Sequence, residues 1–333
     1  MLFGQAQSTS DSISRAIVVT GPTATGKTKL AVAIAKAFNG EIISADSRQV
    51  YTSMDIGTGK DLDDYGSGSA AVRHHLIDVV APQDDFHLFR YLKLAWAALD
   101  DILNRNRLPI ICGGTPLYIN AMLNGYDIDG GEPDHALRQE LADKSLPELV
   151  SILEQGAPTE LVARTDLSQP RRVIRAIEIA RHATTFASSR RLHQSLVIAP
   201  FFPRHVVHER IATRLDERLA NGLIEEVQRL HEQGLSWERL DWFGLEYRYV
   251  ALYLQNKLSL DDMREQLLSR IRQFCKRQDI WFRKLEREGT VIHWLDKQPI
   301  DKAKALVQLW LNQQPLPEPS IKISQTLYGP KTQ

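Results

Sequence analysis

The sequence is poor in cysteine and has no excess of charge of either sign. Cys112 and Cys275 are the two cysteines in 333 residues, and neither belongs to a Cys-x-x-Cys pair. This scarcity excludes a disulfide framework and a zinc ribbon, and it fits a protein that works in a reducing cytoplasm. Lysine plus arginine balance aspartate plus glutamate at 41 each, so a nucleic-acid surface requires local clustering of basic residues.

Long apolar runs are missing as well. No run approaches the roughly 20 residues that a helix needs to span a bilayer. Residues 1–14 contain no lysine or arginine, so they do not resemble a signal peptide. Hydrophobic residues make up 43% of the chain, which is enough for a core of normal size. We therefore expect a cytoplasmic monomer with no membrane partner and a flexible leader over residues 1–14.

Short apolar runs alternate with helical stretches in the first part of the chain. Strands are predicted at residues 16–20, 41–45, 76–80 and 108–112, and helices at residues 27–38 and 89–104. Strands that alternate with helices indicate a parallel sheet with helices on its faces. We expect an α/β fold with a P-loop NTPase-like parallel sheet.

The strand signal disappears after residue 125. Residues 126–195 predict several helices, and we interpret them as a helical insertion domain between core strands. Beyond it, the sequence predicts a strand at 196–199, long helices over 204–285, and a final strand at Trp294 with a helix over 302–311. The catalytic core would then comprise residues 15–125 and 196–315, and residues 316–333 would form a disordered tail.

Residues 21–28 (GPTATGKT) form a candidate phosphate-binding loop, because they match the pattern G-x-x-x-x-G-K-[ST] between a predicted strand and a predicted helix. Its backbone amides and the positive end of the helix can hold anionic oxygens. Lys27 adds a charge, and the Thr28 hydroxyl can bind Mg²⁺. The expected diphosphate-binding residues are Gly21, Pro22, Thr23, Ala24, Thr25, Gly26, Lys27 and Thr28.

Asp46 directly follows the second predicted strand, at the edge of the sheet that faces the ligand crevice. Its position alone is compatible with three roles. The carboxylate could hold Mg²⁺ as in ATPases, it could accept a proton from a nucleophile, or it could cap the next helix. A P-loop by itself is typical of a nucleoside triphosphatase or a kinase.

The segments that follow favour a different class of enzyme. Residues 44–51 (SADSRQVY) and 54–60 (MDIGTGK), together with the form of the P-loop, resemble the signature of tRNA dimethylallyltransferases, also called tRNA isopentenyltransferases. Further similar segments are HHLID at 74–78, GGTPLY at 113–118, and KRQ at 276–278 with Trp281, Phe282 and Arg283. The resemblance runs from about residue 16 to residue 295, with the motifs in the order of the family.

The resemblance implies a prenyl transfer in place of a phosphoryl transfer. A dimethylallyl group would move from dimethylallyl diphosphate to the exocyclic amine of an adenosine. That adenosine would lie 3′ of the anticodon in tRNAs that read codons beginning with U. Pyrophosphate would leave, and Lys27, Mg²⁺ on Thr28 and Arg210 would stabilise its charge. Arg214, one helical turn later, is the alternative to Arg210.

By the same resemblance, Asp46 would accept the proton of the amine, Thr23 would contact the diphosphate near the breaking bond, and Thr115 would stand where the adenine enters. The target base must be extruded from the anticodon stem-loop. Basic residues cluster at 171–191 and 264–287, with six and eight lysines or arginines. The residues expected to contact tRNA are Asp46, Ser47, Arg48, Gln49, Thr115, Arg138, Arg171, Arg172, Arg175, Gly244, Arg248, Lys276, Arg277, Gln278 and Arg283.

Two segments depart from the family pattern. Ser168-Gln169-Pro170 stands where many members have an Asn-Asp pair, and Gly244-Leu-Glu-Tyr-Arg248 stands where Gly-Tyr-Arg is usual. The C-terminal end has no two-Cys, two-His zinc finger of the kind that eukaryotic members carry, which indicates a bacterial type.

Three rival interpretations remain at this point. An adenylate isopentenyltransferase would act on a free adenine nucleotide and would need neither the insertion nor the basic helices. A P-loop kinase or ATPase would need an apolar strand that ends in a metal-binding Asp, whereas residues 108–112 are followed by Gly-Gly. A non-catalytic RNA-binding module would need neither Lys27 nor Thr28.

Overall fold

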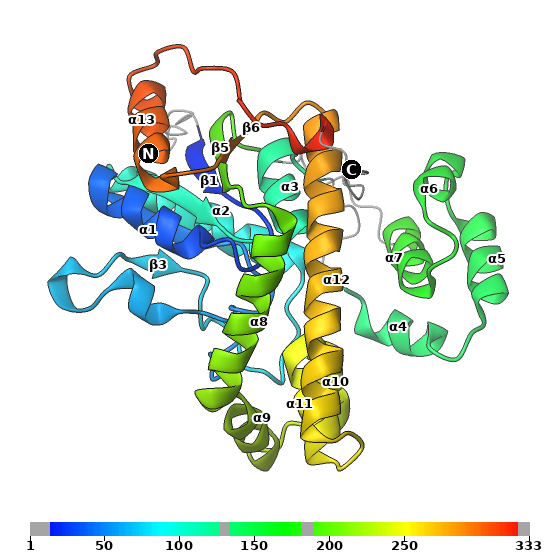
Figure 1. The fold of residues 1–333 in the computed structure, drawn as a ribbon. Helices are drawn as coiled ribbons and strands as arrows, with labels where there is room; N and C mark the ends of the chain where they lie inside the picture. Colours follow the sequence, from blue (N-terminus) through cyan, green and yellow to red (C-terminus); the bar gives the residue numbers. More distant parts are fainter. Residues whose placement is uncertain (1–13, 127–132, 182–189, 326–333) are drawn as a thin grey trace, which may run out of the picture.

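The computed structural model describes residues 14–126, 133–181 and 190–325, which contain a parallel sheet with helices on both faces (Figure 1). The expected leader up to residue 13 and the end of the expected tail, 326–333, lie outside these residues. Ser14, the last residue of that leader, is buried, and its hydroxyl donates to the carbonyl oxygen of Arg191 at 3.1 Å. Residue 14 therefore belongs to the folded core.

Every strand of the described sheet runs parallel to its neighbours, in the order β3-β2-β4-β1-β5-β6. The strands are β1 (Arg15–Val19), β2 (Gly40–Ser44), β3 (His74–His75), β4 (Leu108–Cys112), β5 (Gln194–Pro200) and β6 (Ile292–Leu295). The strand predicted at 76–80 is wrong, because Leu76 and Asp78 adopt left-handed backbone angles (φ 63° and 56°) that end β3 early. Val80 makes only an isolated bridge to Tyr51.

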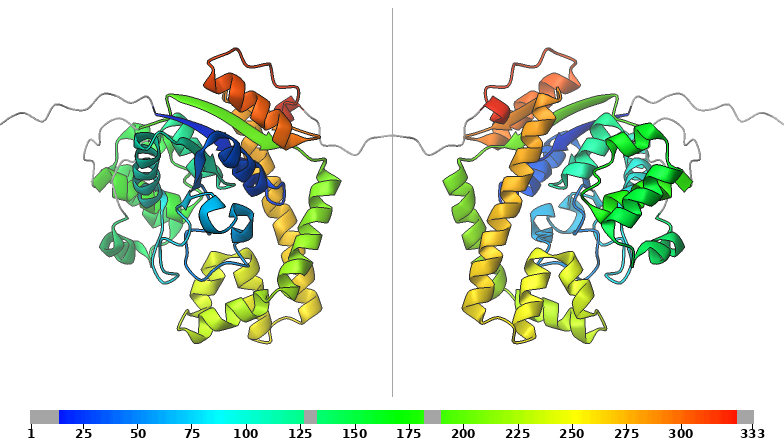
Figure 2. Two further views of the ribbon diagram at one scale, coloured as in Figure 1. Left: turned by 90° about the vertical axis from the view of Figure 1, so that its left-hand side faces the viewer. Right: turned by 90° about the vertical axis from the view of Figure 1, so that its right-hand side faces the viewer.

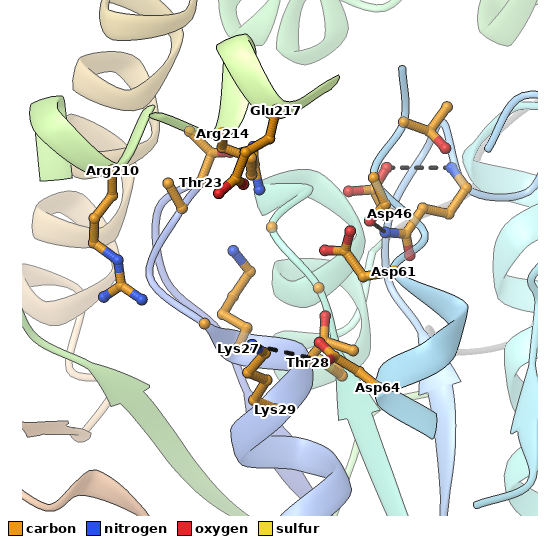
Figure 3. Close-up of a pocket in the computed structure, with 18 of the residues that line it drawn as sticks. Thr23, Lys27, Thr28, Lys29, Asp46, Asp61, Asp64, Arg210, Arg214 and Glu217 are labelled. Atoms are coloured by element: carbon orange, nitrogen blue, oxygen red, sulfur yellow. Dashed lines mark hydrogen bonds and ion pairs between the residues drawn. The ribbon is translucent and has the colours of Figure 1, made fainter. Parts of the chain in front are cut away.

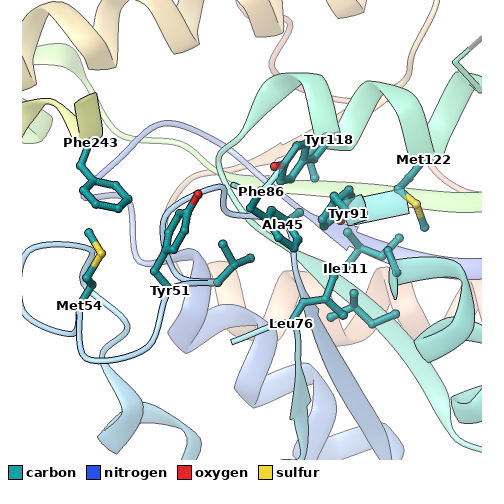
Figure 4. Packing of buried hydrophobic residues seen from close by; sticks show 14 of the residues in the cluster. Ala45, Tyr51, Met54, Leu76, Phe86, Tyr91, Ile111, Tyr118, Met122 and Phe243 are labelled. Carbon is teal, nitrogen blue, oxygen red and sulfur yellow. The ribbon is translucent and has the colours of Figure 1, made fainter. Parts of the chain in front are cut away.

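The apolar side chains of β1, β2, β4, β5 and β6 alternate between two apolar clusters. Ile17 and Val19 pack in the cluster of α1 (Lys27–Phe38) and α13 (Pro299–Leu311). Ala16 and Val18 point to the other face, which α2 (Leu88–Asn104) and α3 (Pro116–Asn124) cover. On that face the rings of Tyr91 and Tyr118 stack with centroids 3.9 Å apart (Figure 4). Since both faces are covered, the strands appear in the sequence as continuous apolar runs.

Two helical regions extend from this core. Residues 133–181 of the predicted insertion are helical, with α4 (His135–Leu141), α5 (Leu146–Gly156), α6 (Thr159–Arg164) and α7 (Pro170–Arg181) around an apolar cluster of their own. Residues 127–132 and 182–189 of the insertion lie outside the described residues, and its expected end at 195 is wrong because β5 begins at Gln194. The second region comprises α8 (Arg204–Ala220), α9 (Leu223–Glu232), α10 (Trp237–Phe243), α11 (Leu245–Leu254) and α12 (Leu260–Arg287). Helices α8 and α12 run side by side from the sheet to α9, α10 and α11 at the far end (Figure 2).

The chain beyond α13 returns to α12. Ile323 is only 1% exposed and belongs to the same apolar cluster as residues of α12. The expected disorder is therefore wrong for residues 316–325, because burial of this side chain holds the segment in place. Within the described ranges, no helix combines the length and apolarity that crossing a bilayer requires.

Candidate active site

A cavity of about 770 Å³ opens where the segments after β1, β2 and β4 meet α8 (Figure 3). These segments converge because parallel strands end at the same edge of the sheet, where α/β proteins bind their ligands. The lining includes these residues predicted from the sequence: Thr23, Ala24, Gly26, Lys27, Thr28, Asp46, Gln49, Arg210, Arg214 and Gln278. The structure thus brings these residues together around one cavity, whereas Pro22 and Thr25 line a separate pocket beside α12 and Gly21 lines neither.

The P-loop has the backbone of an anion-binding turn. Gly21 (φ 130°), Ala24 (φ 62°) and Gly26 (φ 79°) take left-handed angles, which allow successive amides to point to one side. Gly26 precedes the first turn of α1, which carries no acidic residue that would offset the positive end of the helix. The loop therefore offers both amide donors and a helix dipole to an anion.

Lys27 is half-buried, and its amine points into the cavity (Figure 3). The Nζ atom donates to the carbonyl oxygen of Pro22 at 2.7 Å. Burial lowers the pKa of Lys27 to about 8, and the positive charge of Arg214 acts in the same direction. An anion in the cavity opposes both effects, so binding of a diphosphate and protonation of Lys27 favour each other.

Thr23 is held from two sides. Arg214 Nη2 donates to Thr23 Oγ1 at 2.6 Å, and the amide of Thr23 donates to Gln278 Oε1 at 2.9 Å. Gln278 is only 4% exposed, and its Nε2 donates to the carbonyl oxygen of Gly114 at 2.7 Å. The predicted contact of Gln278 with tRNA does not fit this placement, because its side chain joins the P-loop to the segment after β4.

The two candidate arginines of α8 are placed differently. Arg214 is half-buried and reaches Thr23, and burial lowers the pKa of Arg214 to about 10. Arg210 is exposed, and its guanidinium stacks 4.3 Å from the ring centroid of Phe202. Arg210 also contributes to the lining of the cavity, but in Figure 3 its side chain lies apart from those of Lys27, Asp46 and Arg214. The geometry therefore favours Arg214, the alternative from the sequence, over Arg210.

Asp46 uses one carboxylate oxygen to fix its own orientation. Its Oδ1 accepts the amides of Arg48 at 2.8 Å and Gln49 at 3.4 Å, so Asp46 caps a turn and not the helix that the sequence left open, because residues 47–50 form a turn. No residue in the described part of the chain hydrogen-bonds to Oδ2. Asp46 also lines the cavity with Lys27, so the same carboxylate can cap a turn and face a ligand.

The segment after Asp46 is braced by side chains of other elements. The amide of Ser47 donates to Thr115 Oγ1 at 2.9 Å, so Thr115 stands behind Ser47. Gln49 donates through Nε2 to the carbonyl oxygen of Gly59 at 2.9 Å. The guanidinium of Arg48 lies over the ring of Trp242, 4.7 Å from its centroid.

Five acids of the cavity lining were not predicted as site residues. Asp61, Asp63 and Asp64 come from the segment after β2, and Glu209 and Glu217 come from α8. The acidic run at 61–64 was visible in the sequence, but its place relative to the sheet was not. Within the described residues, no cluster of three His, Cys, Asp or Glu side chains could hold a metal ion by itself.

A second cleft of about 820 Å³ is lined by residues of α2, α3 and the insertion helices. Its lining includes the predicted tRNA residues Arg138, Arg171, Arg172 and Arg175. Arg138 and Arg175 pair with the fully buried carboxylate of Glu178, and their charge lowers the pKa of that acid against the effect of its burial. Arg171 is exposed at the rim.

The remaining predicted tRNA residues lie between α10 and α12. Gly244 (φ 74°) joins α10 to α11, and the exposed Arg248 pairs with Asp241 at 2.7 Å. Lys276 and Arg277 are exposed on α12, whereas Arg283 is only 16% exposed, 3.1 Å from Asp279. Of the two aromatic residues in this segment, Phe282 is fully buried against Trp294, and Trp281 is half-buried.

Comparison with protein families gives two matches. Residues 49–285 match the family described as IPP transferase, and residues 14–76 match the one described as isopentenyl transferase. The chain is 47% identical over 283 residues to tRNA dimethylallyltransferase 2 of Trichlorobacter lovleyi, covering 84% of this chain and 91% of that protein. It is 47% identical over 300 residues to tRNA dimethylallyltransferase 1 of Hahella chejuensis, covering 89% and 97%.

Solved structures share the fold. A tRNA isopentenylpyrophosphate transferase from Bacillus halodurans superposes with a TM-score of 0.64 at 30% identity, covering 90% of this chain and 96% of its own. A eukaryotic dimethylallyltransferase acting on tRNA gives a TM-score of 0.77 at 22% identity, covering 91% and 81%. At that lower identity the likeness concerns the fold alone.

Proposed function

The chain belongs to the IPP transferase family and is a tRNA dimethylallyltransferase, and we propose that the cavity at the P-loop is where its reaction takes place. The reaction moves a dimethylallyl group from dimethylallyl diphosphate to the exocyclic amine of an adenosine in tRNA and forms i6A. We assign that adenosine to the position 3′ of the anticodon in tRNAs that read U-starting codons. The observation that carries the proposal is that Lys27, Asp46 and Arg214 from three separate elements line one cavity.

The P-loop side binds the leaving group. Its amides and the positive end of α1 hold the diphosphate, and Lys27 and Arg214 stabilise the charge that develops as the carbon–oxygen bond breaks. The hydroxyl oxygen of Thr28 lines the cavity and fits Mg²⁺, which proteins bind through one or two side chains plus substrate phosphates. When bound, Mg²⁺ would further neutralise the leaving diphosphate.

Asp46 accepts the proton of the adenine amine, the nucleophile of the reaction. The adenine amine is a weak nucleophile because its lone pair is delocalised into the ring. As its nitrogen bonds to the allylic carbon, the carbon–oxygen bond breaks and the proton of the amine passes to Asp46 Oδ2. A positioned base of this kind contributes typically ~10²–10⁴-fold to the rate. The hydrogen bonds to Oδ1 hold the carboxylate in place for this step.

The anticodon stem-loop would lie over the cleft between the core and the insertion helices. The insertion helices supply arginines there, and α12 carries the exposed Lys276 and Arg277 outside this cleft. Such basic residues bind phosphates and make the affinity salt-dependent. A free adenine nucleotide needs none of these contacts, so the arrangement favours tRNA over AMP as the acceptor.

One assay tests the proposal. Radiolabelled dimethylallyl diphosphate is offered with tRNA, with AMP, or alone, and the label transferred to each acceptor is counted. We expect label in tRNA and release of diphosphate. Transfer to AMP but not to tRNA would show an adenylate isopentenyltransferase instead, and no transfer to either would exclude both.

A further inference from the structure

Glu226 of α9 anchors a distant loop of the core. It is 1% exposed, and its carboxylate accepts four hydrogen bonds. The amides of Asp55, Ile56 and Gly57 donate at 2.8, 2.7 and 3.0 Å, and the hydroxyl of Tyr247 donates at 2.8 Å. These donors replace the water that the buried charge has lost, so the contact holds only if the loop stays in place.

Two further side chains fit against the glycines of the same loop. A Cβ atom on Gly57 would lie 2.6 Å from the ring of Tyr247, and one on Gly59 would overlap the guanidinium of Arg218. Arg218 Nη1 donates to the carbonyl oxygen of Gly57 at 3.3 Å and pairs with Glu246 at 3.1 Å. Glu246, which pairs with Arg218, belongs to the segment that departs from the usual Gly-Tyr-Arg.

The loop that Glu226 holds, residues 55–59, is linked by hydrogen bonds to Asp46, the candidate base. Thr58 and Gly59 line the cavity, and the carbonyl oxygen of Gly59 accepts Gln49 Nε2 at 2.9 Å. The amide of Gln49 in turn donates to Asp46 Oδ1 at 3.4 Å. Displacement of the loop would therefore move one wall of the cavity and the partner of Gln49, while the P-loop has no contact with Glu226.

We propose that Glu226 is a positioning residue for the transfer: it holds the amides of residues 55–57 and so sets the wall against which Asp46 and the adenine are aligned. The inference rests on the proposed function of the cavity. Because Glu226 acts on the acceptor side only, its loss should reduce the rate of transfer without reducing the affinity for dimethylallyl diphosphate.

The test compares three variants of the full chain. Glu226→Gln keeps the size of the side chain but replaces one carboxylate oxygen with an NH₂ group. That group is a donor and cannot accept hydrogen bonds from the backbone amides of residues 55–57. We expect kcat with tRNA to fall about 10- to 100-fold, while calorimetry gives a diphosphate affinity within about threefold of the parent. Tyr247→Phe keeps the ring against Gly57 and removes one donor, so kcat should fall about two- to fivefold. Glu41→Gln is the matched control.

Glu41 is also a buried carboxylate, 5% exposed, and it pairs with Arg105 and His75 near the start of β2, away from the cavity. Its variant should unfold at a lower temperature with an unchanged kcat. A normal kcat in folded Glu226→Gln would overturn the proposal, as would an equal loss of diphosphate affinity. If that variant does not fold, a normal kcat in Tyr247→Phe would overturn it instead. If the parent chain itself transfers no dimethylallyl group to tRNA, the proposed function is refuted, and with it the role of Glu226.

Discussion

The two sides of the cavity are built in opposite ways. The phosphate side is built around one continuous segment, residues 21–28, on a single strand–helix connection, to which α8 adds Arg214 and α12 adds Gln278. The acceptor side is assembled from the segment after β2 and from helices far along the chain, with Glu226 bound to amides 169 to 171 positions earlier. The conformation of the P-loop is set by its own backbone, whereas the acceptor side keeps its shape only if the helices packed against it stay in place. Variants on the two sides should therefore fail in different ways.

The largest effect is expected from Asp46→Asn. The side-chain carbonyl oxygen of the asparagine can still accept a hydrogen bond from the backbone amide of Arg48, so the turn is kept. The asparagine side chain cannot, however, take up the proton of the adenine amine. We expect kcat to fall ~10²–10⁴-fold, while the affinity for dimethylallyl diphosphate stays within about threefold. Single-turnover assays with labelled donor and calorimetry measure the two quantities. Near-normal turnover would show that Asp46 only caps the turn.

Lys27→Met should weaken the binding of the diphosphate. Loss of a charge-assisted bond of about 1.5–3 kcal/mol weakens diphosphate binding roughly 10- to 150-fold, as calorimetry would show. In the parent chain the affinity should decrease as the pH rises through about 8, because Lys27 then loses its proton. The methionine variant should lack this pH dependence. An affinity that does not change between pH 7 and 9 in the parent would contradict the assignment.

The same shift has a consequence for stability. The pKa of Lys27 in the folded chain lies below its ordinary value, so the folded state binds this proton less tightly than the unfolded state does. This loss of folding stability is absent above the ordinary pKa, where neither state holds the proton. It is complete below about pH 8, where both states hold it. Lys27→Met should therefore raise the unfolding temperature at pH 7 while it weakens diphosphate binding.

Arg214→Gln and Arg210→Gln form a matched pair on one helix face. Arg214 contacts Thr23 inside the cavity, so its loss should lower kcat about 10- to 100-fold through the leaving group. Arg210 stacks on Phe202 at the surface, and its loss should change kcat less than about threefold. The reverse order would restore the assignment that family resemblance gave to Arg210.

The same contrast explains what the sequence could predict. The P-loop and helix 27–38 were predicted correctly because motif and helix are local, and the structure has that helix at Lys27–Phe38. Gln278 was assigned to tRNA because nothing in its own segment shows that it reaches Thr23, 255 positions earlier. Arg210 and Arg214 are one helical turn apart, so spacing alone could not decide which of them faces the cavity. The anchor at Glu226 gave no signal beyond the departure near residue 244.

The smallest effect is expected where the acceptor side meets the RNA backbone. Arg171→Gln with Arg172→Gln removes two cations from the rim of the insertion cleft, where each would contact a phosphate. KM for tRNA should rise a few-fold, and the slope of log affinity against log salt should become shallower by about 1 to 2. Arg229→Gln, an exposed arginine on α9, is the control and should leave both quantities unchanged. A parent-like salt slope in the double variant would place the stem-loop elsewhere, whereas an altered diphosphate affinity would show that the insertion and the P-loop are coupled.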